Sequence, residues 1–312
     1  MQVRRVASSA RVMNKLLAGL ALATALGVIS ATAATKPNPS MSDVFYVSNA
    51  RGPIRPAGLG PLQGDVASEI LAGPTNGLDS AYIIYTRMAE GARERGLYTL
   101  PVEHTYLVLS GKMNVQIGTD QFVVGPETLV LVPAGVPHRA WNAGSEPVAD
   151  FEVITPAPLR DLNSMMSPAT ARKVDNAAQY IRVAEPLNKL SGGTGHDFLN
   201  ERVLANRATG SEYVLERLND VLPGGGRTEL HIHPFDQVYF VTKGTMTVQY
   251  GLATYEAGEN TLVLLPNGVV HSNQNKGSSL QSAITLLLPE PPKGTPLGAG
   301  VEIQRLPGQP GK

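Results

Sequence analysis

The feature that most constrains the fold is a duplication, because residues 98–142 align without a gap on residues 231–275 at a constant offset of 133. Short runs also agree, so that Thr128-Leu129-Val130-Leu131 matches Thr261-Leu262-Val263-Leu264. The matched single positions are Gly111 and Gly244, Gly125 and Gly258, Pro133 and Pro266, Gly135 and Gly268, His138 and His271, and Asn142 and Asn275. Self-similarity at one fixed spacing indicates two copies of a supersecondary unit, and hence two similar domains rather than a solenoid.

The composition favours short strands joined by many turns. The chain has 312 residues, of which 42% are hydrophobic and 17% are charged, so it can bury one or two ordinary cores. Its 32 glycines and 24 prolines stand mostly between short runs of Val, Leu and Thr, a pattern typical of an all-β protein. The chain has no cysteine, so neither disulfides nor thiolate metal ligands contribute.

Three histidines of the second copy have a spacing that predicts a metal site. His231 and His233 are separated by one residue, and alternate side chains of a strand project from the same face. His271 lies far along the chain, after a Pro-Asn-Gly turn, as expected if a second strand closes the site from the opposite side. Neutral imidazoles placed in this way chelate divalent metals.

The second copy resembles the two signature motifs of the cupin superfamily. It contains Gly225, five residues, His231-x-His233, three residues, Gln237, six residues and Gly244, followed later by Gly258 and Pro266-x-Gly268-x-x-His271-x-x-x-Asn275. The resemblance covers roughly residues 60–160 and 190–290 and implies an all-β fold of two tandem cupin (jelly-roll) barrels, a bicupin. The family includes dioxygenases, decarboxylases, isomerases, storage proteins and ligand-sensing domains, so the resemblance implies the fold more specifically than the function.

The resemblance also implies a ligand set for the metal. In metal-binding cupins the two histidines and the glutamate of the first motif hold the ion together with the histidine of the second. The corresponding residues here are His231, His233, Gln237 and His271, so an amide replaces the carboxylate. Four neutral ligands leave a divalent ion with its full charge, and a chelating carboxylate, enolate or catecholate-like ligand is expected beside it. We expect one divalent ion, with Fe2+ favoured because dioxygen could bind beside the substrate, and with Mn2+, Co2+, Ni2+, Cu2+ or Zn2+ as alternatives.

Acid–base chemistry at this site would need a neighbouring residue, because the amide of Gln237 cannot act as a base. Counting by twos from His231 places Glu229 and Arg227 on the same strand face, and counting from Gln237 places Tyr239 there, unless a bulge shifts the register. Glu229 is therefore the candidate base, Arg227 the candidate clamp for a substrate carboxylate, and Tyr239 the candidate hydrogen-bond donor to oxygen bound at the metal. The alternative for each is an ordinary rim or interface residue.

The first copy has a degenerate version of the site. The positions that correspond to the metal ligands of the second copy hold Tyr98, Leu100, His104 and His138. An apolar Leu100 in this cluster argues against a complete coordination sphere. We therefore expect a structural barrel whose histidines are satisfied by hydrogen bonds, with weak metal binding by Tyr98, His104 and His138 as the alternative.

The domain boundaries follow from the two copies and their flanks. We predict a signal peptide at 1–34, an N-terminal cupin domain at 42–160, a connector with a short helix at 161–192, a C-terminal cupin domain at 193–290 and a flexible tail at 291–312. Within the connector, Ser167-Pro168 is a favourable helix start. The residues Val174, Ala177, Ala178 and Ile181 then recur at helical spacing, which predicts one short amphipathic helix.

The first residues have the pattern of a secretory signal peptide. Four basic residues precede an apolar stretch at 16–29, and Ala31-Thr32-Ala33 offers small residues for cleavage. This predicts a periplasmic or secreted protein, with an uncleaved anchor and twin-arginine export as alternatives. Without the four basic residues of the leader, the chain keeps 22 of its 26 basic residues and all 26 acidic ones, so it is mildly acidic. No nucleic-acid partner is therefore expected. We expect a small-molecule substrate, no membrane attachment after cleavage, and a homodimer as one form of assembly.

Two classes of function follow from these features. The first is a metal-dependent enzyme of the cell envelope, foremost an oxygen-dependent dioxygenase that acts on a small chelating phenolic compound, diketone or carboxylate. A non-redox isomerase, lyase or decarboxylase stays open within this class. The second class is a non-catalytic cupin that binds a metal or a small ligand.

Overall fold

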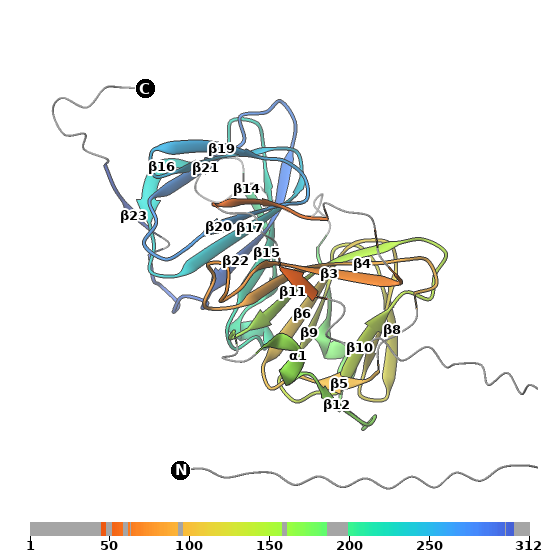
Figure 1. Cartoon of the computed structure of the whole chain (residues 1–312). Coiled ribbons are helices and arrows are strands. Elements are labelled where there is room, and N and C mark those ends of the chain that lie inside the picture. The colour runs from red at the N-terminus through yellow and green to blue at the C-terminus, as the bar shows by residue number, and fades with distance from the viewer. Residues whose placement is uncertain are drawn as a thin grey trace, which may run out of the picture. The chain divides into compact units, whose positions relative to one another are not determined.

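The structure is a computed structural model that describes residues 45–47, 52–58, 62, 64–92, 96–157, 161–185, 199–296 and 298–302. It is an all-β protein with two barrels, each built from two sheets (Figure 1). The predicted fold class, two tandem jelly-roll barrels, is confirmed. The signal peptide predicted at 1–34 lies outside the described residues. In the described ranges no helix has both the length and the apolar character that a membrane crossing requires.

The N-terminal barrel contains a larger and a smaller sheet. The larger sheet has, in spatial order, β1 (Phe45–Val47), β3 (Val66–Ala72), β4 (Tyr82–Met88), β11 (Val148–Thr155), β6 (Glu103–Ser110), β9 (Thr128–Val132) and β13 (Ile181–Val183). The smaller sheet has β12 (Ser167–Pro168), β5 (Tyr98–Thr99), β10 (His138–Trp141), β7 (Met113–Ile117) and β8 (Asp120–Val124).

The C-terminal barrel repeats this arrangement. Its larger sheet has β14 (Leu199–Ala205), β15 (Leu215–Val221), β22 (Gln281–Leu288), β17 (Asp236–Lys243), β20 (Thr261–Leu265) and β2 (Ile54–Pro56). Its smaller sheet has β19 (Ala253–Ala257), β18 (Met246–Tyr250), β21 (His271–Gln274), β16 (Gly226–Ile232) and β23 (Ala299–Gly300). The strands from β6 to β11 correspond one by one to those from β17 to β22 at the offset of 133, and β3 and β4 extend this correspondence to β14 and β15.

The glycines shared by the two copies hold equivalent turns. Gly111 and Gly244 follow β6 and β17 and have φ values of +75° and +74°, which an L side chain rarely adopts. A Cβ atom at Gly111 would also lie 2.4 Å from the carbonyl oxygen of Pro147, and one at Gly244 would lie 3.0 Å from that of Leu280. The repeated glycines are therefore explained by a tight turn packed against the strand that follows in the barrel.

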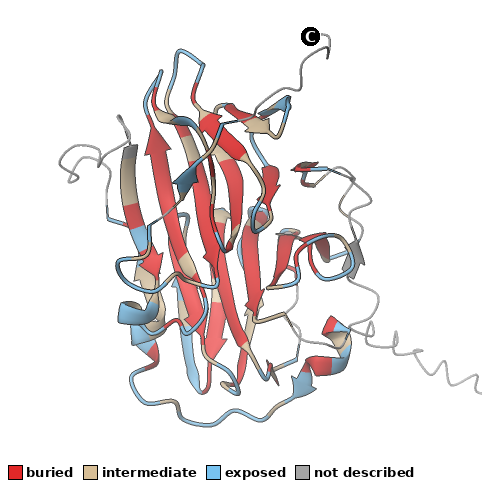
Figure 2. Ribbon diagram, turned by 90° about the vertical axis from the view of Figure 1, so that its left-hand side faces the viewer, coloured by how far each residue is buried: buried red, intermediate tan, exposed pale blue. Residues whose placement is uncertain are grey.

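The two barrels exchange strands and share one core. The short β2 precedes the first barrel but pairs with β20 of the second, whereas β13 precedes the second barrel and pairs with β9 of the first. Phe240 of β17 packs against Phe151 of β11 and Tyr85 of β4, with ring centroids 4.9 and 5.9 Å apart. Buried residues accordingly follow the long strands of the molecule (Figure 2). The exchange covers two sheet edges that would otherwise present unpaired backbone groups.

The connector differs from its prediction. Short helical turns are present at α1 (Leu162–Met165) and at the 3-10 helix η2 (Ala177–Tyr180), and a further 3-10 turn, η4, follows β14 at Arg207–Thr209. The helix predicted to begin at Ser167-Pro168 is wrong, because these residues form β12 and pair with β5. Ile181 begins β13 instead of ending a helix. Val174, Ala177 and Ile181 do pack against the core of the first barrel. Pairing with the open edges of β5 and β9 nevertheless outweighs the helical preference of this segment.

Candidate metal centre

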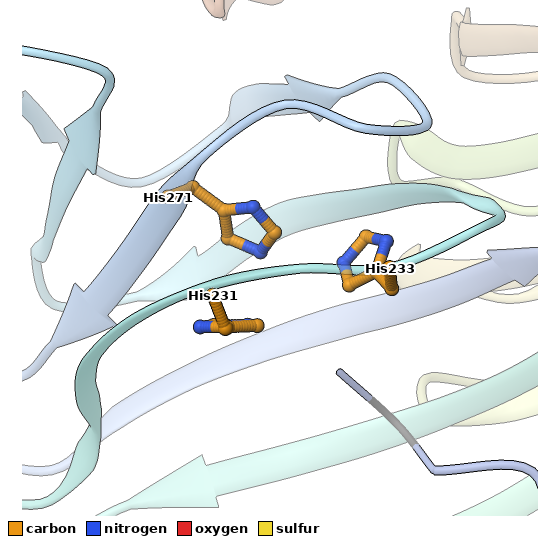
Figure 3. A group of neighbouring side chains, drawn as sticks. All are labelled: His231, His233 and His271. Carbon is orange, nitrogen blue, oxygen red and sulfur yellow. The ribbon is translucent and has the colours of Figure 1, made fainter. Parts of the chain in front are cut away.

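The three histidines of the second copy meet at one end of the C-terminal barrel. His231 is in β16, His233 follows that strand, and His271 begins β21, where it is the cross-strand partner of His231. One ring nitrogen from each lies within 4.8 Å of the others, and all three side chains are buried. Figure 3 shows the imidazoles gathered between the segment that carries His231 and His233 and the strand that carries His271. This group can hold a metal ion.

Backbone carbonyls fix the tautomer of each ring. The Nδ1 atoms of His231, His233 and His271 lie 2.9, 2.8 and 2.9 Å from the carbonyl oxygens of Glu229, Phe235 and Val269 respectively. A carbonyl oxygen only accepts, so each Nδ1 carries the proton and each Nε2 keeps its lone pair. Such partners commonly orient metal-ligating histidines, and they prepare three Nε2 atoms for coordination here.

Gln237 contributes a fourth lone pair to the same point. Its Oε1 lies 2.8 Å from Nε2 of His233 and 3.2 Å from Nε2 of His271. Its amide nitrogen donates to the hydroxyl of Tyr239 at 2.8 Å, and that hydroxyl donates to Oδ1 of Asn273 at 3.4 Å, which orients the oxygen toward the imidazoles. With the tautomers given above, all the converging atoms are lone-pair donors. A cation is the partner that satisfies all of them, so the residues fit a divalent metal.

Burial keeps the nearby groups neutral. The pKa of His271 is lowered to about 3, mainly because burial disfavours the imidazolium, and the neighbouring His231, His233 and Arg227 lower it further. The pKa of Tyr239 is raised to about 12 by burial, although Arg217 and Arg227 act in the opposite direction. His271 is therefore available as a ligand at acidic pH, and Tyr239 is a phenol that can donate a hydrogen bond.

A cavity of about 220 Å³ adjoins the histidine group and extends along the inner face of the larger sheet. Of the residues predicted for the site, Arg227, His231, Gln237 and Tyr239 line it. The cavity is large enough for a small organic molecule, and it places a guanidinium beside the candidate metal ligands.

Glu229 is not among the residues that line this cavity. The prediction that its side chain faces the site as a base is therefore wrong. The pairing of β16 with β21 shifts between Arg227, which faces Asn273, and His231, which faces His271. Four residue steps on β16 therefore span two on β21, and the extra residues bulge outward with an exposed Glu229. Gly226, with φ +116°, precedes the bulge, and the Gly224-Gly225-Gly226 run was the signal in the sequence for it.

The cavity has a polar wall that the motif-based analysis missed. Arg217 and Asn219 of β15, Gln281 of β22 and Glu201 of β14 all line it. At the offset of 133 their counterparts in the first copy are the shorter or apolar residues Ile84, Thr86, Val148 and Ser68. Extending the comparison of the two copies upstream of residue 98 and downstream of residue 142 would have revealed this wall.

The tail also contributes to the site, although its range was predicted to be flexible. Within it, β23 pairs with β16, and the register places Gly300 opposite His231. A Cβ atom at Gly298 would lie 2.9 Å from Cδ2 of His231 and 3.0 Å from a guanidinium nitrogen of Arg227. The tail backbone therefore packs directly against a candidate ligand and a cavity residue.

The equivalent cluster of the N-terminal barrel is a closed hydrogen-bond network. Nδ1 of His104 lies 3.2 Å from Nε2 of His138, and Nε2 of His104 lies 2.9 Å from Oε2 of Glu152. The hydroxyls of Tyr98 and Tyr106 lie 2.7 Å apart. Leu100 is part of a hydrophobic core, and the adjoining cavity is only about 20 Å³, the size of one water molecule. Burial, followed by the neighbouring His104, lowers the pKa of His138 to about 3.

This arrangement matches the structural barrel expected for the first copy. Among the described residues, a group of three His, Cys, Asp or Glu side chains with ligand atoms within 4.8 Å of one another is formed by His231, His233 and His271.

Comparison with known proteins supports the duplicated architecture. The family model described as "Cupin domain" matches two regions, residues 84–154 and 218–286. No curated protein matches the chain at a significant level.

Several solved structures are similar in fold. AerE from Microcystis aeruginosa is 14% identical with a TM-score of 0.55, and the match covers 76% of this chain and 97% of AerE. Oxalate decarboxylase from Bacillus subtilis is 14% identical with a TM-score of 0.54, and the match covers 76% of this chain and 76% of that one. A cupin 2 conserved barrel domain protein from Leptotrichia buccalis is 11% identical with a TM-score of 0.50, covering 74% and 92%. At these identities the likeness concerns the fold alone.

Proposed function

The chain is a two-domain cupin, and from this we propose that its C-terminal barrel is a metal-dependent enzyme acting on a small, chelating organic anion. One observation carries the proposal: three imidazole Nε2 atoms and Oε1 of Gln237 converge beside a 220 Å³ cavity that also contains arginine. Metal ligands next to enclosed, positively charged space are suited to binding and activating an anion.

The protein would hold one divalent ion through His231, His233, His271 and Gln237. When bound, the ion supplies Lewis acidity and open coordination positions for a chelating substrate, and iron, the favoured metal, would also supply a place for dioxygen. The ligand set carries no negative charge, and Arg227 adds a positive charge to the cavity. Substrates that arrive as carboxylates, enolates or catecholates are therefore favoured over neutral ones.

The protein residues around the cavity would bind and orient such an anion. Arg227 offers a planar set of donors suited to a carboxylate. The hydroxyl of Tyr239 makes a long 3.4 Å contact with Asn273, so it can turn toward a substrate oxygen while still accepting from Gln237. The imidazole of His233 stacks on Phe235, with ring centroids 4.3 Å apart, which holds the ring in place beside the cavity.

Within this class we propose an oxygen-dependent dioxygenase. Glu201 is the acidic residue among those that line the cavity, and its Oε1 is 2.9 Å from Nη1 of Arg217, so it is neutralised by an ion pair. Isomerases and other enzymes that abstract a proton need a free base near the substrate. A dioxygenase whose substrate already arrives as an anion has less need of one, and this favours oxygen chemistry over proton transfer.

A non-catalytic binding protein is the second candidate, because the same lack of an unpaired base suits a site that only binds its ligand. Metal analysis and oxygen uptake separate the two. The protein would be loaded anaerobically with Fe2+ or Mn2+, and oxygen consumption would be followed with catechols, β-diketones and hydroxy acids. Stoichiometric metal with substrate-dependent uptake supports the dioxygenase, whereas stoichiometric metal with neither oxygen uptake nor conversion of any compound on the panel supports the binding protein.

The ligand assignment has its own test with a matched pair of variants. We expect His271→Ala to lose the bound metal and His138→Ala, at the equivalent position of the first barrel, to keep one ion per chain. Circular dichroism would verify that both variants are folded. A full metal complement in His271→Ala would overturn the metal site and the function built on it.

We also propose that the protein acts outside the cytoplasm, in the periplasm or after secretion, on the basis of the signal-peptide pattern at 1–34. Cell fractionation combined with N-terminal analysis of the mature protein tests this. A protein that keeps Met1 and stays in the cytoplasmic fraction would contradict it.

A further inference from the structure

We propose that the cavity contains a second ligand subsite, anchored by Arg217, which binds a carboxylate at the far end of the substrate. The substrate would then be an organic dianion with a chelating head at the metal and an anionic tail at Arg217. This inference rests on the proposed metal-dependent function for the head group, whereas the tail subsite is argued from residues of β14, β15 and β22, strands that carry none of the candidate metal ligands.

The strand register places this subsite along the cavity from the metal ligands. Gln237 and Tyr239 of β17 pair with Leu287 and Thr285 of β22, and Thr285 pairs on its other side with Arg217 of β15. Arg217 therefore lies at the same level of the sheet as Tyr239. This level is two residues, or about 7 Å along the strand direction, from that of Gln237. Asn219 is one alternate position further, so both side chains line the wall away from the histidine group.

Several polar atoms of this wall are buried without a hydrogen-bond partner. They are Nε of Arg217, Oδ1 of Asn219, and both amide atoms of Gln281. The exposed fractions of these residues are 9%, 5% and 1%. Burying polar groups without partners is costly, and such groups are rare in folded proteins outside functional sites. Their concentration on one wall of one cavity indicates that a polar ligand group belongs there.

The packing of the barrel does not require polar residues at two of these positions, those of Arg217 and Gln281. The first copy has Ile84 in place of Arg217 and Val148 in place of Gln281, within the same strands and the same turns. Its corresponding cavity is about 20 Å³ instead of about 220 Å³. The second copy therefore replaces apolar side chains with a cation and an amide where its cavity is larger.

The charges of the wall favour an anion. Nη1 of Arg217 pairs with Glu201, which holds the guanidinium in place, whereas Nε of Arg217 has no hydrogen-bond partner and is open to a ligand. The amide nitrogen of Gln281 is a second donor. With Arg227 and a divalent ion in the same cavity, positive charge exceeds the single negative charge of Glu201. A carboxylate tail matches these donors and compensates this excess.

The test is a binding experiment on the full chain loaded with Mn2+ or Co2+. The probes are the straight dicarboxylates from oxalate to adipate, each compared with the monocarboxylate of the same carbon number. Binding of the head group is followed by the loss of metal-bound water in Mn2+ relaxivity or by the visible spectrum of Co2+. We expect one dicarboxylate to bind about tenfold more tightly than its matched monocarboxylate, as one buried charge-assisted contact allows.

Arg217→Met should abolish this preference while the affinity for monocarboxylates changes less than about twofold. Because Arg217→Met leaves Glu201 without its partner, the double variant Glu201→Gln/Arg217→Met serves as a second measurement with no unpaired acid. Arg172→Met, which removes an exposed arginine of the connector, is the matched control and should bind all probes like the wild type.

The outcomes separate this inference from the proposed function. Failure of the wild type to bind metal would overturn the proposed function itself. Metal binding with equal affinity for mono- and dicarboxylates, or a preference that survives Arg217→Met, would overturn the tail subsite alone. A preference that is lost in both Arg217 variants and kept in Arg172→Met would support it.

Discussion

Glu216 provides a pH-dependent test of how the two barrels are joined. It lies on β15, fully buried, and Oγ1 of Thr105 in the first barrel donates to its Oε2 at 2.9 Å. Burial raises its pKa to about 8, the hydrogen bond from Thr105 acts in the opposite direction, and nearby Glu103 raises it further. The carboxyl group is therefore protonated at neutral pH inside the interface between the barrels.

The magnitude follows from proton linkage. Because the pKa is about 8 when folded and about 4.5 when unfolded, the folded state binds more protons between these values. The free energy of unfolding must then fall as the pH rises through this window, and the stabilisation is fully present only below pH 4.5. At 1.36 kcal/mol per pH unit, the loss is on the order of 3–5 kcal/mol by pH 9.

The perturbation is Glu216→Gln, which keeps the shape and removes the titration. We expect the variant to match the wild type within about 1 kcal/mol at pH 5 and to be more stable by about 3 kcal/mol at pH 9. Urea unfolding followed by the fluorescence of Trp141, the single tryptophan, and by circular dichroism measures both values. Glu90→Gln, at an exposed turn of the first barrel, is the control. A difference between Glu216→Gln and wild type that stays constant from pH 5 to pH 9 would refute the reasoning.

Three further substitutions test the metal centre and its surroundings. Gln237→Glu should tighten Mn2+ binding by about tenfold or more and weaken acetate binding to the Mn2+-loaded protein, because the new carboxylate cancels one charge of the ion. Unchanged acetate affinity in the relaxivity assay would contradict this. Tyr239→Phe removes the acceptor for the Gln237 amide and should raise the metal dissociation constant by about tenfold, as measured by chelator competition. An unchanged constant would show that the hydroxyl does not position Gln237. Gly226→Ala should destabilise the protein by about 2 kcal/mol in urea unfolding, because its Cβ would lie 2.7 Å from the carbonyl oxygen of Asn273 at φ +116°; wild-type stability would rule out the close approach.

The sequence allowed the repeated part of the fold to be predicted because the repeat is local. Each matched run of residues 98–142 and 231–275 forms the same strand in both barrels, and the turn glycines adopt the same conformation. The exchange of β2 and β13 could not be predicted in this way. Ile54-Arg55-Pro56 becomes a strand only by pairing with residues more than 200 positions away, and Ile181 leaves its helical pattern for the same reason.

The candidate site shows the same division between local and non-local information. The spacing of His231, His233 and His271 was sufficient to predict their convergence, because strand alternation and one turn determine it. Alternation failed for Glu229 because a bulge changes the register within four residues. The wall that contains Arg217 lies on strands outside the signature motifs, so its approach to the site depends on the closure of the whole barrel.

The two barrels solve the same burial problem in different ways. Both enclose polar side chains at equivalent positions, and Tyr98 and His138 pair across strands β5 and β10 as His231 and His271 pair across β16 and β21. In the first barrel a carboxylate, Glu152, lies within hydrogen-bond distance of His104, so the ring nitrogens find partners inside the protein. In the second barrel the equivalent of Glu152 is Thr285, and Nε2 lone pairs face the oxygen of Gln237 instead. The imidazoles of the first barrel therefore find hydrogen-bond partners within the protein, whereas the lone pairs that converge in the second barrel fit the proposed cation.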